Sequence, residues 1–221
     1  MKNIQELVEK GKYNKALTFI DKILTQDAYN IDLLTLKAQV NYKLERYSEA
    51  IEIYSNLINL VPNNVENYAN RGLAYNAIGD HARSLADFTS AIEFEPDNAY
   101  RYSCRAFIKD YLGDHRGALD DYNKAVKLDP GDEVSLNNRG LIEEKLGRLH
   151  LAQESFASAD KLAGINNQTY NHHVRPAKIA NDKQKSFNFN FFIGVIKGLL
   201  SSADERKKFF NFILNRSNKR L

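Results

Sequence analysis

The chain has 221 residues, of which 43% are hydrophobic, and a formal net charge of +3 at pH 7. This length suffices for one large domain or for a repeat array with an appendage. It contains no run of about 18 apolar residues and starts without an apolar signal-peptide core, so we expect neither a membrane-spanning helix nor a secretory leader. The single cysteine, Cys104, excludes an internal disulfide framework and favours a reducing, cytoplasmic location, with the thiol buried as a small hydrophobic group.

The charge is divided unevenly along the chain. Residues 1–160 hold 19 Lys and Arg against 25 Asp and Glu, whereas residues 161–221 hold 12 against 3. The first part therefore has a net charge of −6 and the second a net charge of +9. A basic block of this kind is typical of a tail that interacts with another surface.

A period of 34 residues organises the chain up to residue 163. A fixed period in this range is typical of a stacked repeat protein. It predicts units at about 1–30, 31–64, 65–98, 99–132 and 133–163. The residues that keep the interval include Pro62, Pro96 and Pro130, and also Gly79, Gly113 and Gly147.

Each unit is predicted to form two helices. The first opens after a polar capping residue, which in successive units is Asn30, Asn64, Asn98 and Asp132. It ends near the glycine, which adopts the left-handed C-terminal conformation at low cost. The second helix ends before the proline, which cannot continue a helix without losing a hydrogen bond.

The first and last units differ from those between them. Residues 3–26 allow only a short, polar first helix, as expected for a cap with no preceding neighbour. The second unit carries Glu45 where glycine is usual. In the fifth unit, Gln153 and Asp160 stand where earlier units hold leucine, isoleucine or valine, which indicates a changed or absent neighbour beyond them.

Small and aromatic residues recur in fixed columns of the units. Small side chains let two helices approach closely, and large ones fill the space beside them. The small columns are Ala38, Gly72, Ala106 and Gly140 in the first helices and Ala16, Ala50, Ser84, Ala118 and Ala152 in the second, and the filling column is Ile20, Tyr54, Phe88, Tyr122 and Phe156. With the helix–turn–helix unit and the closing proline, these columns resemble the tetratricopeptide repeat over residues 3–163.

The resemblance implies an all-α fold, a right-handed superhelical solenoid of about five helix pairs with a concave, ligand-binding inner face. The exposed face of each first helix lines that groove in the family. Apolar residues there would mark a binding surface, or would pack against neighbouring helices, and the sequence leaves both open. Carried onto this sequence, the groove residues are Gln39, Tyr42, Leu73, Asn76, Tyr100, Ser103, Phe107, Tyr111, Asn137 and Leu141.

Some members of the family bind the acidic C-termini of chaperones through a carboxylate clamp of lysines, asparagines and an arginine. Only Asn70 fits such a clamp here. We therefore do not expect this mode of binding, because the other places hold Thr35, Gln39, Tyr100 and Cys104.

Two further columns have a structural interpretation. Arg71, Arg105 and Arg139 recur in phase with Asp87 and Asp121, which favours ion pairs between neighbouring helices over anion receptors in the groove.

The histidine column is the second. His81 and His115 share their column with Tyr13 and Tyr47, which favours aromatic packing over metal ligation.

Beyond the repeats we expect a linker at 164–186 and a basic, aromatic-rich helical segment at 187–221. Phe192, Ile196 and Leu199 fit one face of a helix, whereas the preceding alternation of Phe and Asn is strand-like. Ser202 and Glu205 form a capping box for a last helix. This segment has three interpretations: docking within the chain or between two copies through 187–217, binding to an anionic membrane surface, or binding to a partner.

No phosphate-binding loop, nucleophile motif or metal-ligand cluster is present in the sequence. We therefore expect no enzymatic activity, no catalytic residue, no cofactor and no metal. The predicted function is a protein-interaction scaffold or adaptor that binds a peptide or protein segment in the concave groove. The alternative is a peripheral membrane tether that acts through the C-terminal segment; nucleic acid is not expected, because a basic count without a shaped patch supports it only weakly.

Overall fold

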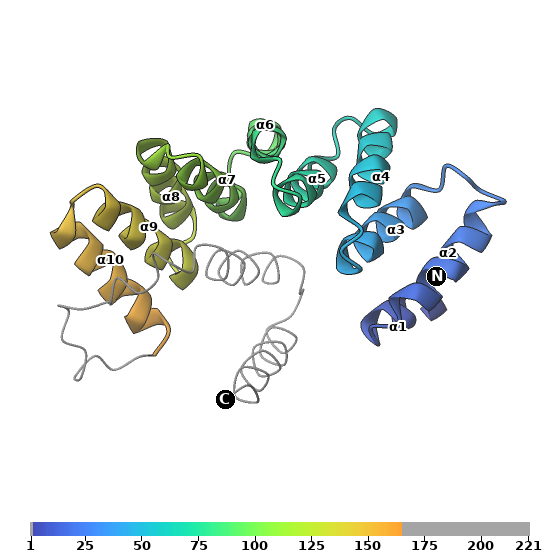
Figure 1. Cartoon of the computed structure of the whole chain (residues 1–221). Coiled ribbons are helices and arrows are strands. Elements are labelled where there is room, and N and C mark those ends of the chain that lie inside the picture. The colour runs from blue at the N-terminus through green and yellow to red at the C-terminus, as the bar shows by residue number, and fades with distance from the viewer. Residues whose placement is uncertain (1, 165–221) are drawn as a thin grey trace. The chain divides into compact units, whose positions relative to one another are not determined.

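A computed structural model describes residues 2–164 of the chain, and ten α-helices fill this part (Figure 1). The first helices of the pairs are α1 (Lys2–Glu9), α3 (Ile31–Lys43), α5 (Val65–Ala77), α7 (Ala99–Tyr111) and α9 (Glu133–Lys145). The second helices are α2 (Tyr13–Leu24), α4 (Tyr47–Leu60), α6 (His81–Phe94), α8 (His115–Leu128) and α10 (Leu149–Leu162). The predicted all-α fold of helix pairs is thereby confirmed.

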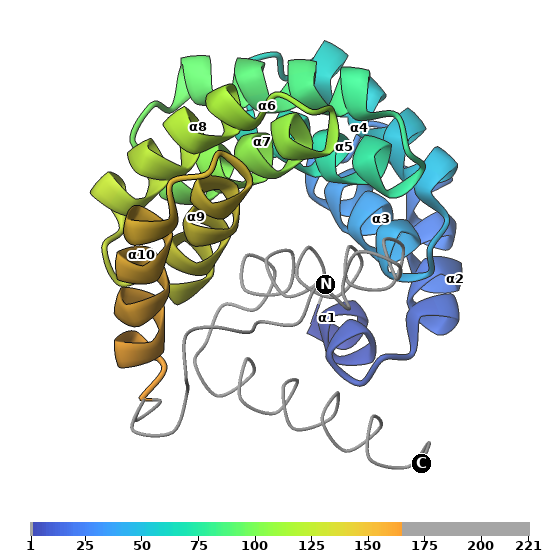
Figure 2. The same ribbon diagram turned by 60° about the vertical axis from the view of Figure 1, so that its left-hand side comes forward.

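The described helices belong to two compact units. Residues 2–121 lie in the first, and the second begins at Tyr122, within α8. In the first unit, α3, α5 and α7 follow one another in one layer, and α4 and α6 lie in a second layer (Figure 2). The expected helical segment at 187–221 lies outside the described residues, as does the expected linker apart from Gly164.

The capping residues fulfil their predicted role only in part. The side chain of Asn30 accepts a hydrogen bond from the backbone N–H of Leu33 at 3.0 Å, and that of Asp132 accepts one from Val134 at 3.1 Å. Asn64 and Asn98 precede their helices with the same extended backbone but make no side-chain cap hydrogen bond. The position thus fixes where the helix begins, while the side-chain bond depends on the local rotamer.

The turns between paired helices need a left-handed residue. Gly79 has φ +81° at this point of its unit, and Glu45 takes the same conformation with φ +61° although it carries a side chain. A non-glycine residue in this region costs on the order of 1 kcal/mol. The α3–α4 turn therefore adopts the repeat geometry against the preference of its own residue.

Close approach of paired helices is visible at the small-residue column. A methyl carbon built on Gly72 would lie 3.1 Å from the ring of Phe88, and one built on Gly140 would lie 2.6 Å from the ring of Phe156. Where the column holds Ala38, a tyrosine, Tyr54, packs in the same hydrophobic cluster. The predicted pairing of small and aromatic residues therefore sets the spacing of the helices.

The arginine column forms ion pairs, as predicted. Arg71 donates two hydrogen bonds to the carboxylate of Asp87, at 2.9 and 2.8 Å, and a third to Ser55 Oγ at 3.1 Å. One guanidinium thus links α4, α5 and α6. Arg105 repeats the arrangement with Asp121, at 2.8 and 2.7 Å. These guanidinium groups are engaged within the fold and do not act as anion receptors.

The second unit departs from this pattern. Ser155 replaces the aspartate, and Arg139 Nε donates to its hydroxyl at 3.0 Å. Ser155 in turn donates to Glu143, on the same helix as the arginine, at 2.6 Å. The carboxylate therefore comes from α9 itself, and only a neutral hydroxyl bridges α9 and α10 in this network.

We predict that Gly140→Ala lowers the free energy of unfolding by roughly 1–3 kcal/mol, because the new methyl group overlaps the ring of Phe156. This loss exceeds the gain in helix propensity, which is about 1 kcal/mol. Urea denaturation followed by circular dichroism measures it. In a Phe156→Leu background the same substitution should cost little. Equal costs in both backgrounds would show that the ring does not set the helix spacing.

We predict that Asp87→Ala destabilises the fold by roughly 3 kcal/mol, since it leaves a largely buried guanidinium without its carboxylate. The double variant Arg71→Met/Asp87→Leu should recover most of this loss. As a control, Lys10→Ala breaks an exposed pair with Glu6 and should cost less than about 1 kcal/mol. A similar small loss for Asp87→Ala would contradict the structural role of the pair.

Candidate functional site

Eight of the ten predicted groove residues lie on three successive first helices of the first unit. We call the surface that they define the first-helix face: Gln39 and Tyr42 on α3, Leu73 and Asn76 on α5, and Tyr100, Ser103, Phe107 and Tyr111 on α7. Asn137 and Leu141 lie on α9, in the second unit, and are half-buried.

Exposure differs among the residues of this face. Leu73 and Asn76 retain only 4% and 3% of their accessible surface, whereas Tyr111 is 56% exposed. The remaining five are half-buried. The face is therefore a mixture of packed and accessible side chains rather than a row of exposed aromatic rings.

Side chains on all three helices influence the hydroxyl of Tyr100 electrostatically. Burial raises the pKa of the Tyr100 hydroxyl well above its ordinary value, and Cys104, Tyr42 and Glu66 raise it further. Tyr42 belongs to α3 and Glu66 to α5, so these interactions connect the first helices of successive units. Cys104 is buried, as predicted.

The Tyr100 hydroxyl is a buried polar atom without a hydrogen-bond acceptor of ordinary strength. Within the described residues it makes no hydrogen bond that meets normal geometry. The thiol of Cys104 is close enough to raise the tyrosine pKa, but a thiol is a weak partner. The neutral hydroxyl keeps its proton and remains a donor.

A second cluster lies at the other end of the helices. Asn76 Oδ1 and His81 Nδ1 lie 2.9 Å apart, and the His81 ring packs on the ring of Tyr111 with centroids 4.0 Å apart. Burial lowers the pKa of His81, with Asp80 opposing the shift, so the neutral ring is favoured. The Asn76 amide nitrogen is buried and has no hydrogen-bond partner among the described residues.

In the histidine column, His81 and Tyr47 pack on aromatic rings as predicted, whereas His115 makes a hydrogen bond to a carboxylate. Tyr47, one unit earlier, meets Tyr42 edge-on with ring centroids 5.3 Å apart. His115, one unit later, lies 2.8 Å from a carboxylate oxygen of Asp110. In each case the residue at the start of the second helix contacts the residue five positions earlier on the first helix. Sequence reasoning missed this contact, although the five-residue spacing was available to reveal it.

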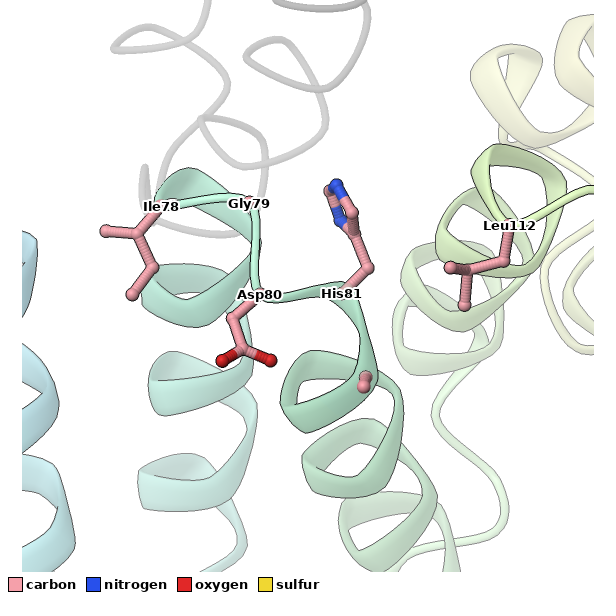
Figure 3. Close-up of a pocket in the computed structure, with 6 residues that line it drawn as sticks. Ile78, Gly79, Asp80, His81 and Leu112 are labelled. Atoms are coloured by element: carbon pink, nitrogen blue, oxygen red, sulfur yellow. The ribbon is translucent and has the colours of Figure 1, made fainter.

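A pocket of about 450 Å³ borders this second cluster (Figure 3). It lies at the α5–α6 turn and at the end of α7. The apolar side chains of Ile78 and Leu112 are both about half exposed. The lining residues are Ile78, Gly79, Asp80, His81, Ala82 and Leu112. The pocket thus extends the first-helix face with an apolar rim beside Tyr111.

Arg101 is a functional neighbour that sequence reasoning missed. It is almost fully buried, and Arg101 Nη2 lies 2.6 Å from Glu66 Oε1. A second ion pair joins it to Glu95. Arg101 therefore holds α7 against α5 and fixes the position of Glu66 on the face.

The described residues show no other type of site. No group of three histidine, cysteine, aspartate or glutamate side chains within residues 2–164 is arranged to hold a metal ion. None of the helices in that range has the length and apolar character required to cross a membrane.

Comparison with known proteins identifies the repeat. A family model described as "TPR repeat" matches residues 38–79, and one described as "Tetratricopeptide repeat" matches residues 65–98 and 105–132. Comparison with the curated proteins found no match.

Solved structures share the fold. A crystal structure of MamA superposes with a TM-score of 0.70 at 22% identity, over 74% of this chain and 96% of that one. MamA from Desulfovibrio magneticus RS-1 superposes with a TM-score of 0.70 at 17% identity, over 75% of this chain and 94% of that one. YrrB, described as "a TPR protein with an unusual peptide-binding site", superposes with a TM-score of 0.62 at 18% identity, over 73% of this chain and 83% of that one. At these identities the likeness shows the fold alone. The ten helices of residues 2–164, the repeat columns of the sequence and the matching family models together show that this chain is a tetratricopeptide repeat protein.

Proposed function

We propose that this protein is a non-catalytic adaptor that binds a peptide or protein segment on the first-helix face. The observation that carries the proposal is a pair of buried donors on that face: Asn76 Nδ2, which has no hydrogen-bond partner within residues 2–164, and Tyr100 Oη, whose partner there is the weak Cys104 thiol. The single cysteine supports a reducing, cytoplasmic location as part of this proposal.

Each of these atoms is a hydrogen-bond donor. The Asn76 amide oxygen is taken by His81, which leaves the amide NH₂ to donate, and the Tyr100 hydroxyl keeps its proton. A buried donor without an acceptor costs about 1–3 kcal/mol. The main-chain carbonyl groups of a bound segment are suitable acceptors. A ligand that supplies them recovers this cost and gains affinity from it.

Apolar contacts supply the rest of the affinity. Leu73 and Phe107 lie at the same position of successive units, 34 residues apart, on adjacent first helices. Leu73 is buried beneath the face, so the accessible apolar surface comes from the half-buried Phe107 and the exposed Tyr111. Apolar side chains of a ligand that pack against these two rings gain about 25 cal/mol for each Å² removed from water. The rim formed by Ile78 and Leu112 offers a further apolar contact.

The charges of the face indicate the chemistry of the ligand. Glu66 is 69% exposed although it pairs with Arg101, and Asp32 holds the equivalent position on α3. Neither acid favours an anionic ligand, which agrees with the missing carboxylate clamp. The proposed ligand is therefore an apolar segment flanked by basic residues. The peptide-binding site described for YrrB supports a peptide ligand for this fold.

The test uses the full chain to select peptides from a random library, followed by affinity measurements on variants. Phe107→Ala should weaken the binding of the selected peptides by more than about 1 kcal/mol, as removal of a central contact does. Tyr100→Phe removes only the hydroxyl and should cost about 0.5–1.5 kcal/mol.

Phe19→Ala is the matched control, because Phe19 is 53% exposed on α2, a second helix. It should leave the affinity unchanged. Peptides that bind equally well to all three variants would place the binding site elsewhere and reject the proposal.

A further inference from the structure

We propose that residues 187–217 of this chain bind the first-helix face of its own repeats and compete there with the partner. The inference rests on the proposed function, since both require this face to accept an apolar segment. It adds the regulation of that site: the partner must displace a segment that the chain itself supplies.

The apolar content of this segment requires a cover. Residues 187–200 contain nine aromatic or aliphatic side chains and a single charged residue, Lys197. Leaving so many apolar groups in water is unfavourable, since burial removes their contact with water. The first-helix face offers apolar surface on the same chain, namely the half-buried Phe107, the exposed Tyr111 and the rim at Ile78 and Leu112.

The hydrogen-bonding groups are complementary. The face holds two buried donors: Asn76 Nδ2, which has no acceptor within the described residues, and Tyr100 Oη, which has there only the weak Cys104 thiol. The segment carries Asn188 and Asn190 between its phenylalanines, and each side chain provides an amide oxygen as an acceptor. Its main-chain carbonyl groups provide further acceptors. Binding therefore satisfies buried polar groups as well as covering apolar ones.

The charges are complementary as well. Residues 1–121 hold 14 Lys and Arg against 18 Asp and Glu, whereas residues 187–217 hold five against two. Asp32 and Glu66 lie in the first turns of α3 and α5, at equivalent positions of the face. The attraction acts over a Debye length of about 8 Å at physiological ionic strength. It favours this basic segment over an acidic competitor.

The intervening chain permits binding within one molecule. Residues 165–186 separate the end of the described repeats from the segment, and 22 residues span up to about 70 Å when extended. A flexible connection of this length gives an effective local concentration in the millimolar range. Even a weak interaction between the segment and the face is then mostly formed. The same segment of a second copy of the chain competes poorly for the face, because its concentration is lower.

Amide hydrogen exchange on the full chain tests the proposal. Residues 187–217 should be protected, and the protection should not change on dilution. Phe107→Asp should speed their exchange about tenfold, which corresponds to about 1.4 kcal/mol. Tyr100→Phe, a milder change to the same face, should speed it to a smaller extent. Phe19→Asp, on the outer helix α2, should leave it unchanged.

Exchange of the α3–α7 amides provides the check on folding, because it should stay slow in all three variants. If Phe107→Asp unfolds the repeats, the exchange of residues 187–217 in Tyr100→Phe is the measurement that tests the proposal. Unprotected exchange in the native chain would overturn the proposal and leave the segment to another partner or a membrane. Protection that weakens on dilution would overturn it in favour of a second copy. Protection that both face variants leave unchanged would place the segment elsewhere.

A tail variant separates this inference from the proposed function. Phe192→Asp/Ile196→Asp in the full chain should release the segment and strengthen the binding of selected peptides about tenfold, equivalent to about 1.4 kcal/mol. Peptide binding to the face without protection of the segment would reject the inference alone. Protection of the segment by the face without peptide binding to the released chain would reject the proposed function alone.

Discussion

The close approach of two helices within each repeat is the constraint on which the rest of the structure depends. A methyl group at Gly140 would overlap the ring of Phe156, and one at Gly72 would lie tightly against the ring of Phe88, because the aromatic residue on the second helix lies against the backbone. This short separation brings the neighbouring position within reach of the partner helix. Arg71 can therefore bind the Asp87 carboxylate with two hydrogen bonds and still reach Ser55 of the preceding unit. Packing and electrostatics thus depend on one small side chain per unit.

The packing residues between the helices recur from unit to unit, whereas the residues of the first-helix face differ between units. The positions that hold Gly72, Arg71 and Phe88 perform the same task in neighbouring units, whereas the face holds Tyr42 and Asn76 at one position and Leu73 and Phe107 at another. The recurring residues hold the helices in a regular arrangement, and the varying residues give the face its particular chemical groups. The pair of buried donors, Asn76 and Tyr100, arises from that variation, since the equivalent residues of other units differ.

The sequence predicted the helix pairs, the small and aromatic columns and the Arg–Asp pairs because each follows from spacing within one or two units. Other features depend on geometry that spacing does not determine. The side-chain caps at Asn64 and Asn98 are absent, because the backbone position alone does not fix the rotamer. The structure also brings Tyr42 close enough to Tyr100 to raise the pKa of its hydroxyl, although the two residues lie far apart in the chain. For the candidate site, the sequence supplied the residues on α3, α5 and α7 but missed Arg101 and the contact between His81 and Asn76, which hold them in place.

The altered network at Arg139 has a consequence for how this protein opens. In a repeat array, stability is a sum of terms within units and between nearest neighbours, so fraying begins where those terms are smallest. At α10 the charged bridge between paired helices is replaced by the hydroxyl of Ser155, and three leucines of that helix are exposed. A mechanical pull applied through the residues that follow α10 would therefore act on a pair of helices that this network joins through a neutral hydroxyl, whereas around α5 and α7 it would have to break arginine–aspartate pairs.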